Sequence, residues 1–259
     1  MPVRVGVQVQ PQHANFEGMR AAWREADALG ADTIFNWDHF YPLYGEPDGK
    51  HFEGLTTLAS MAEVTERAQI GALVICNSYR NPELVADAHR TIDHISGGRA
   101  ILGIGAGWFQ RDYDEYGYEF GDAPFRLRHL KADLPRIRAR LAKLNPPPVG
   151  RLPILIGGSG PKVTLRLVAE HADMWHSFGD AEAFKTKNDI LLEHCAAVGR
   201  DPSEIERTWG VDDDNVLEHV DDLVAAGVEH VIVGIGGDGK GYDLGQLREL
   251  VAWRDRVNA

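Results

Sequence analysis

A carboxylate and an imidazole stand side by side at Asp38 and His39, directly after the short hydrophobic run 33–36. An imidazole can exchange a proton near neutral pH, and a carboxylate beside it can orient the ring or raise its pKa. A strand buried in a core has little use for such a pair at its end, whereas a strand that opens into a ligand pocket does. We expect His39 to be a proton donor or hydrogen-bonding partner that Asp38 positions. The alternative is a structural histidine held by a hydrogen bond.

A second candidate site is the glycine-rich segment Gly157, Gly158, Ser159 and Gly160, which follows a hydrophobic run and precedes an expected helix start at 161–162. Glycines let the backbone approach an anion closely, and the first amides of the following helix point toward that anion. The same pattern also suits a plain tight turn in which Ser159 only caps the helix. Phosphate binding and a simple turn are both compatible with these residues.

A third glycine cluster, Gly103, Gly105 and Gly107, lies at the end of another hydrophobic run. Its spacing is G-x-G-x-G, which differs from the G-x-G-x-x-G of a dinucleotide-binding turn, and no clean helix start follows. A Rossmann interpretation is therefore weak. We interpret these glycines as making room for a flat ligand that lies across the end of the strand.

The elements that must position these residues alternate regularly. Short β-rich runs, separated by helical segments, occupy residues 3–9, 33–36, 69–76, 100–105, 153–156, 173–177, 205–210 and 230–235. Most of these runs lack strict alternation, which is typical of parallel strands buried on both faces. Eight such units within 259 residues predict an α/β fold, a (β/α)8 TIM barrel formed by one domain over residues 1–259.

Two of the intervening segments show hydrophobic residues at helical spacing. Gly30 is a plausible C-cap for the first segment, and Asn81 is a candidate N-cap for the second. The expected buried faces are Met19, Ala22, Trp23, Ala26 and Leu29 in the first helix, and Leu84, Ala88, Ile92 and Ile95 in the second. In a barrel, the long segments 41–54 and 108–125 would follow the second and fourth strands and would shape the substrate pocket.

Composition excludes several classes of protein. The formal net charge of -12 does not attract nucleic acid or an anionic membrane surface. Two cysteines are too few for a disulfide framework, and no apolar run approaches membrane-spanning length. The N-terminus resembles a strand more than a signal peptide, so we expect a cytoplasmic protein that acts on a small molecule.

Metal and Schiff-base chemistry find no support in the sequence. The histidines form no HxH or HExxH pair, and no lysine falls within an expected strand. The acidic run Asp212-Asp213-Asp214 is interpreted as a solvated loop and helix start. We therefore expect no metal site.

Several dispersed segments together resemble the luciferase-like monooxygenase superfamily, especially its short actinobacterial coenzyme F420-dependent oxidoreductases. These segments are DHISGGR at 93–99, LGIGAGW at 102–108, PILIGGSG at 153–160, LRLVA at 165–169, ADMW at 172–175 and GRDPS at 199–203. They occur in the family's order, and the last two strand–helix units match least well.

The resemblance implies a (β/α)8 barrel with a flavin or deazaflavin ring in its mouth. Leu73 and Val74 would form a bulge in the third strand that backs the ring, often through a cis non-proline peptide. The glycine-rich segment at 157–160 would hold the cofactor's phosphate. The implied cofactor-binding residues are Asp38, His39, Leu73, Val74, Cys76, Gly105, Ala106, Gly107, Gly157, Gly158, Ser159 and Gly160.

The function implied by the resemblance is an F420-dependent oxidoreductase that transfers a hydride between the deazaflavin and a small organic substrate. An FMN-dependent monooxygenase or reductase on the same barrel is one alternative. A non-catalytic F420 or flavin carrier is the second, because some deazaflavin-dependent dehydrogenases have a glutamate where this chain has Trp108. Relatives are often dimers, so a homodimer is possible.

Overall fold

The computed structural model describes residues 2–211 and 216–259, and the acidic run Asp212–Asp214 lies outside these ranges. Parallel strands form one closed sheet in the order β3-β2-β1-β9-β8-β7-β6-β5-β4, with β3 also pairing with β5. The strands are β1 (Arg4–Val9), β2 (Thr33–Asn36), β3 (Gln69–Ala72), β4 (Ile75–Cys76), β5 (Ala100–Gly105), β6 (Ile154–Gly157), β7 (Met174–Phe178), β8 (Glu206–Val211) and β9 (His230–Ile235). Each expected run holds strand, and β3 and β4 share one barrel position, so the predicted (β/α)8 barrel is confirmed.

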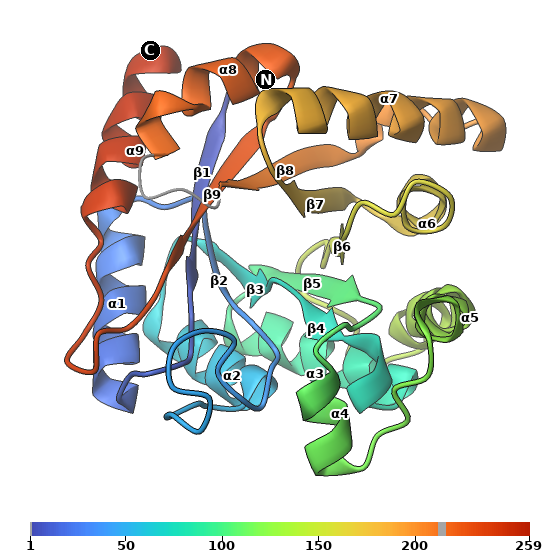
Figure 1. Ribbon diagram of the computed structural model, residues 1–259, viewed down its shortest axis with the longest axis horizontal. Helices are drawn as coiled ribbons and strands as arrows, with labels where there is room; N and C mark the ends of the chain where they lie inside the picture. Colours follow the sequence, from blue (N-terminus) through green and yellow to red (C-terminus); the bar gives the residue numbers. More distant parts are fainter. Residues whose placement is uncertain (1, 212–215) are drawn as a thin grey trace.

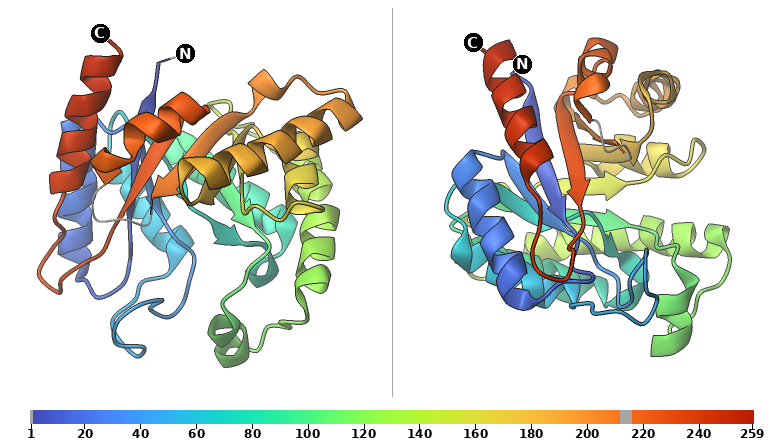
Figure 2. Two further views of the ribbon diagram at one scale, coloured as in Figure 1. Left: turned by 45° about the horizontal axis from the view of Figure 1, so that its top comes forward. Right: turned by 60° about the vertical axis from the view of Figure 1, so that its left-hand side comes forward.

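Helices surround the strands on the outside (Figures 1 and 2). They are α1 (Phe16–Leu29), α2 (Gly54–Val64), α3 (Pro82–Ile95), α4 (Gln110–Tyr116), α5 (Ala123–Leu141), α6 (Thr164–His171), α7 (Ala181–Val198), α8 (Val220–Ala226) and α9 (Gly245–Val257). Short 3-10 helices are η1 (Asn77–Tyr79), η2 (Pro202–Glu204) and η3 (Val216–Glu218). The pairing of β1 with β9 closes the barrel, and α9 lies beside α1 near both chain ends (Figure 1).

The helix that follows β1 matches its prediction, whereas the buried face of α3 does not. In α1, Met19, Ala22, Trp23 and Ala26 are buried, and Gly30 adopts the left-handed conformation of a C-cap. In α3, Asn81 caps the helix as expected.

The expected apolar face of α3 is wrong at two positions, because Leu84 is 58% exposed and Ile95 is 42% exposed, whereas Ile92 is buried as expected. The helix instead buries Val85, His89 and Asp93. The Asp93 carboxylate accepts hydrogen bonds from the backbone amides of Val149 and Gly150, at 2.7 and 2.9 Å. Because His89 and Asp93 are polar, hydrophobic spacing alone does not locate this buried face.

The expected third strand, 69–76, is interrupted at Leu73 and Val74. The peptide between these two residues is cis, so the bulge and the cis bond implied by the resemblance are both present. The Leu73 amide donates to the Asn36 carbonyl at 2.8 Å, and Gln8 Nε2 donates to the Leu73 carbonyl at 2.7 Å. Hydrogen bonds from β1 and β2 therefore hold the bulge on the inside of the barrel.

The glycines of β5 face this bulge. A Cβ atom at Gly103 would lie 2.0 Å from the Ala72 carbonyl oxygen, and one at Gly105 would lie 2.8 Å from Val74 Cγ2. The space that these glycines leave is filled by the protein's own bulge. The expectation that they clear room for a flat ligand is therefore wrong at Gly103, whereas at Gly105, which lines the cavity described below, it stays a prediction.

Side chains fill the barrel below the bulge. The packed residues are Phe35, Leu73, Ile101, Leu155, Met174 and Ile232. Further toward the amino-terminal end of the strands, buried His230 contacts Glu206 at 2.9 Å and Thr33 at 2.9 Å, and Arg4 contacts Glu206 at 3.0 Å. A ligand can therefore enter only from the carboxyl ends of the strands.

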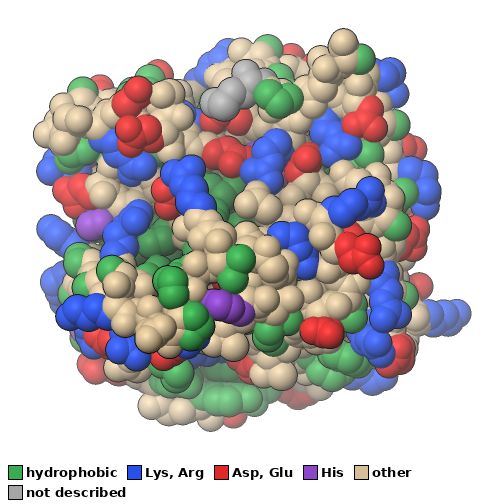
Figure 3. Space-filling model, turned by 180° about the vertical axis from the view of Figure 1, so that it is seen from behind, with side chains coloured by type: hydrophobic (Ala, Val, Ile, Leu, Met, Phe, Trp, Pro, Cys, Tyr) green, Lys and Arg blue, Asp and Glu red, His purple; other side chains and the backbone are tan. Residues whose placement is uncertain are grey.

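The surface carries charges of both signs. On the face seen in Figure 3, acidic and basic side chains are interspersed, and no single basic patch dominates. Within the described ranges, no helix combines the length and the apolar character that crossing a membrane requires.

Candidate active site

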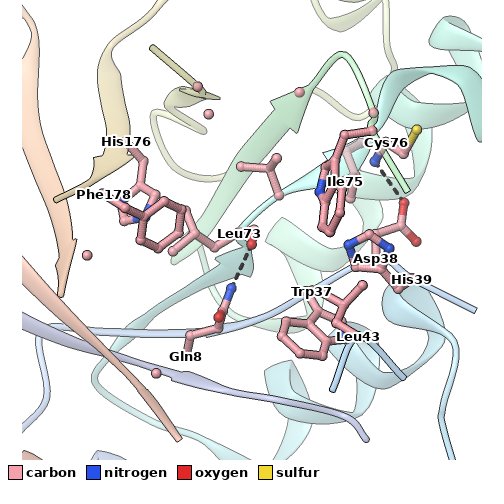
Figure 4. Close-up of a pocket in the computed structure, with 18 of the residues that line it drawn as sticks. Gln8, Trp37, Asp38, His39, Leu43, Leu73, Ile75, Cys76, His176 and Phe178 are labelled. Carbon is pink, nitrogen blue, oxygen red and sulfur yellow. Dashed lines mark hydrogen bonds between the residues drawn. The ribbon is translucent and has the colours of Figure 1, made fainter. Parts of the chain in front are cut away.

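A cavity of about 910 Å³ opens at the carboxyl ends of the strands. All the site residues expected from the sequence line it: Asp38, His39, Leu73, Val74, Cys76, Gly105, Ala106, Gly107, Gly157, Gly158, Ser159 and Gly160. Figure 4 shows how residues from β1, from the segment after β2, from β4 and from β7 converge on this space. Their shared location follows from the barrel, whereas their roles in binding a cofactor stay predictions.

His39 is held by a carboxylate, but that carboxylate belongs to Asp112. The His39 Nδ1 atom lies 2.7 Å from Asp112 Oδ2, and the Asp112 side chain has no exposed surface. Asp112 lies in the first turn of α4. It also accepts hydrogen bonds from the Phe40 amide at 3.0 Å and the Tyr79 hydroxyl at 2.9 Å. The expectation that Asp38 orients His39 is therefore wrong.

Asp38 instead forms a buried ion pair. Its two oxygens accept hydrogen bonds from Arg80 at 2.6 and 2.8 Å, and Oδ2 also accepts from the Cys76 amide at 3.0 Å. Burial disfavours the guanidinium charge, but hydrogen bonds and attraction from Asp38 and Glu53 outweigh it and raise the pKa of Arg80. Asp38 thus fixes β4 to the end of β2 and carries a neutralised charge.

Aromatic rings surround the His39 imidazole. Its ring centroid lies 5.8 Å from that of Trp37, 5.8 Å from that of Trp108 and 5.5 Å from that of Phe109, all in edge-to-face arrangements. Trp37 donates through Nε1 to His51 at 2.9 Å, and burial lowers the pKa of His51 to about 4. Because Nδ1 of His39 is engaged by Asp112, Nε2 is the nitrogen left for a ligand in the cavity.

The buried Cys76 thiol lies in the cavity wall. Burial raises its pKa to about 11, so the thiol stays protonated near neutral pH. Its Sγ lies 3.1 Å from the Tyr113 hydroxyl. A Cβ atom at Gly107 would lie 2.0 Å from the same hydroxyl, so Gly107 is required for this close packing.

The glycine-rich loop after β6 is exposed at Gly158 and Gly160. Two hydrogen bonds with β7 hold the loop in place. Gly158 has φ +119°, its amide donates to the His176 carbonyl at 2.9 Å, and Trp175 Nε1 donates to the Gly158 carbonyl at 2.8 Å. Helix α6 begins at Thr164, later than expected, and its N-cap is Val163. Ser159 therefore does not cap this helix. Within the described part of the chain, the Ser159 hydroxyl makes no hydrogen bond.

The two segments expected to shape the pocket contribute unequally. The segment 41–54 supplies Leu43 and Tyr44 to the lining, whereas 108–125 supplies Trp108. The second segment is more regular than expected, because it contains all of α4. Sequence reasoning missed Asp112, although it stands in the acid-rich segment after the fourth predicted strand, where a partner for His39 could have been sought.

The profile of the luciferase-like monooxygenase family matches residues 1–212. The chain belongs to this family. This luciferase-like protein is 34% identical over 115 residues to an F420-dependent glucose-6-phosphate dehydrogenase of Amycolatopsis mediterranei (strain U-32). That match covers 44% of the chain and only 34% of the relative's length.

Solved structures of similar shape agree with the family's barrel. An F420-dependent secondary alcohol dehydrogenase in complex with an F420-acetone adduct superposes on this luciferase-like protein with a TM-score of 0.79 at 16% identity, covering 93% of this chain and 94% of the other. The oxygenating constituent of 3,6-diketocamphane monooxygenase from Pseudomonas putida, in complex with FMN, gives a TM-score of 0.64 at 14% identity, covering 81% and 67%. At these identities the similarity establishes the fold alone.

Proposed function

We propose that this protein is an F420-dependent oxidoreductase that transfers a hydride between the deazaflavin and a small organic substrate. The observation that carries the proposal is one cavity that joins the His39–Asp112 pair, the cis bulge and the glycine-rich loop. The names of the Amycolatopsis relative and of the alcohol dehydrogenase favour F420 over FMN.

The lining residues fit such a cofactor. The exposed loop at 157–160 offers glycine backbone and an uncommitted Ser159 hydroxyl to a phosphate. Leu73 and Val74 offer an apolar bulge for a flat ring, and Gly105, Ala106 and Gly107 lie at its edge. When bound, the deazaflavin supplies the hydride chemistry, and the protein supplies orientation and a site for the proton.

The protein itself contributes proton transfer, and the atom that accepts or donates the proton is His39 Nε2. Asp112 accepts from Nδ1–H, which fixes the ring and leaves the Nε2 lone pair facing a ligand. In alcohol oxidation, Nε2 would take the hydroxyl proton, and the bound deazaflavin would accept the hydride from the substrate's C–H bond. In the reverse direction, Nε2–H returns the proton to the carbonyl oxygen, and Asp112 stabilises the charged imidazolium.

Reconstitution and turnover test the proposal. The protein should bind F420 in preference to FMN, and reduced F420 should be oxidised by at least one member of a panel of ketones, enones, imines and nitro compounds. A His39→Ala variant should retain cofactor binding and lose about 10²-fold or more in turnover. His129→Ala, on the exposed side of α5, is the matched control and should behave like the parent protein.

Three other outcomes would each change the conclusion. Micromolar binding of FMN without binding of F420 would replace the proposed cofactor. Cofactor binding without turnover of any acceptor would favour a carrier. Unchanged turnover in His39→Ala would remove that residue from the mechanism. The homodimer and the cytoplasmic location stay predictions, and light scattering tests the first of them.

A further inference from the structure

Three half-exposed aromatic side chains ring the mouth of the cavity. Tyr44 is 65% exposed, Trp108 is 63% exposed and Phe178 is 50% exposed, and all three line the cavity. They come from the loop after β2, the loop after β5 and the end of β7. Large aromatic surfaces held at a ligand site favour apolar or ring-shaped ligands that cover them.

Trp108 and His39 line the same cavity, and their rings meet edge to face. The two ring centroids lie 5.8 Å apart at an interplanar angle of 73°. His39 itself is only 12% exposed at its side chain, so it lies deeper than Trp108. A molecule whose carbonyl or hydroxyl reaches His39 Nε2 therefore has the exposed Trp108 ring within reach of the rest of its body.

The described part of the cavity lining contains no lysine or arginine and no unpaired carboxylate. Among the described residues that form it, the ionisable side chains are Asp38, the deeply buried Cys76 and Tyr79, the half-exposed Tyr44, and two histidines. Asp38 is neutralised by Arg80, and burial lowers the pKa of His176 to about 3, so that ring is uncharged near neutral pH. Gln8 and Gln10 supply neutral polar groups on the opposite wall.

Three arginines near the cavity are engaged by other groups, and Arg126 is one of them: its Nε donates to the Gly107 carbonyl at 3.0 Å and its Nη1 to the Phe120 carbonyl at 3.0 Å. Arg80 binds both Asp38 and Glu53, and Arg111 pairs with Asp48 and stacks on the Tyr41 ring at 3.9 Å. The glycine-rich loop offers one place for a phosphate, which the proposed function assigns to the cofactor.

We infer that the substrate is an uncharged alcohol or carbonyl compound with an apolar, ring-sized body that stacks on Trp108, and that sugar phosphates are excluded. The inference rests on the proposed function and narrows its substrate class. An anionic substrate would have to shed its hydration shell in a pocket whose cations are engaged, which is costly. A ring that covers Trp108 gains from burial instead.

A matched pair of ketones tests the inference. Cyclohexanone and 4-oxocyclohexane-1-carboxylate share a ring and a carbonyl and differ by one negative charge. With reduced F420, we expect kcat/KM for the carboxylate to be about 100-fold lower or worse, because its charge finds no partner. With oxidised F420, cyclohexanol should be turned over and glucose 6-phosphate should not.

Variants and a binding measurement complete the test. Trp108→Ala should raise KM for cyclohexanone about 10-fold and leave the Kd for F420 unchanged, because one ring contact is lost. Leu84→Ala removes a side chain of similar exposure, 58%, outside the cavity and should change neither value. Tryptophan fluorescence titration of the F420-loaded protein should show saturable binding of cyclohexanone and none of glucose 6-phosphate.

The two levels of the proposal fail in different ways. Efficient oxidation of glucose 6-phosphate, or equal kcat/KM for the two ketones, would overturn the substrate class and leave the F420-dependent function standing. Bound F420 with no turnover of any alcohol or ketone would overturn the function and the substrate class together. An unchanged KM in Trp108→Ala would overturn the stacking role of that residue.

Discussion

The Nδ1 atom of His39 lies 2.7 Å from Oδ2 of Asp112, a residue 73 positions further along the chain. Asp112 is fully buried and also binds the Tyr79 hydroxyl and the amides of Phe40 and Tyr41. Burial raises the pKa of Tyr79, with further contributions from Cys76 and Asp112, so its hydroxyl keeps the proton that it donates. The Asp112 carboxylate therefore binds donors from the segments after β2 and β4, and these contacts surround the His39 imidazole.

Replacing Asp112 by Asn should impair turnover much more than cofactor binding. All hydrogen-bonding partners of the Asp112 carboxylate are donors. The asparagine amide group would turn N–H donors toward some of these donors, so the His39 ring would lose its fixed orientation. We expect kcat to fall about 10²-fold, with an altered pH profile and a Kd for F420 within about twofold of the parent value.

Asp114→Asn, on the exposed side of the same helix, is the control for the Asp112 variant and should leave kcat unchanged. In a double-mutant cycle, adding Asp112→Asn to His39→Ala should cost little more, because both act through one imidazole. Full turnover in Asp112→Asn would contradict the positioning role.

Asp38→Asn should destabilise the fold. The substitution removes the principal carboxylate partner of Arg80, whose side chain is only 14% exposed. Losing the partner of a buried charge costs about 3–5 kcal/mol, and because Glu53 still pairs with Arg80 we expect a loss at the lower end of this range, which urea denaturation measures. Glu25→Gln breaks an exposed pair with Arg248 and should have no measurable effect. Equal stability of the two variants would show that Asp38 does not anchor β4 as described.

Gly105→Ala should destabilise the protein by about 1–3 kcal/mol, because the new methyl group would overlap Val74. Adding Val74→Ala should recover much of this loss by removing the obstructing methyl groups. Gly241→Ala is the control, since a Cβ atom there meets nothing within 4 Å. If Val74→Ala gave no recovery, the bulge would not be the reason for a glycine at position 105.

Acid should weaken the fold partly through His89. Burial lowers the pKa of this fully buried ring to about 4, and its Nε2 has no partner. The unfolded chain takes up a proton near the ordinary pKa of 6.5, whereas the folded protein does so only near 4. Stability from this residue is therefore complete at higher pH and is lost as pH falls below about 6.5.

The free energy of unfolding measured at about pH 8 and about pH 5 checks this expectation. Between the two, the parent protein should lose roughly 2 kcal/mol more than a His89→Leu variant. His129→Leu, which changes an exposed histidine, should keep the parent's pH dependence. Parallel pH profiles for the parent and His89→Leu would contradict the low pKa.

Local patterns were sufficient to predict the barrel and the location of its site. The alternation of β-rich and helical segments fixes the topology, because parallel strands need a crossover between them. In a closed parallel barrel all carboxyl ends meet at one mouth, so residues at the ends of β2, β4, β5 and β6 had to share a cavity. The cis bulge at Leu73 and Val74 was accessible only through family resemblance, since nothing local in these residue types encodes it.

Tertiary structure decided which groups act together inside that cavity. Successive side chains of an extended segment point in different directions. Although Asp38 and His39 are neighbours in the sequence, Asp38 therefore pairs with Arg80 and His39 pairs with Asp112. The roles of Gly103 and Gly105 depend on a bulge from another strand, and the buried face of α3 depends on the loop that Asp93 binds. Sequence determined where chemistry could occur, through periodicity along the chain, whereas contacts between distant segments determined which residues form each pair.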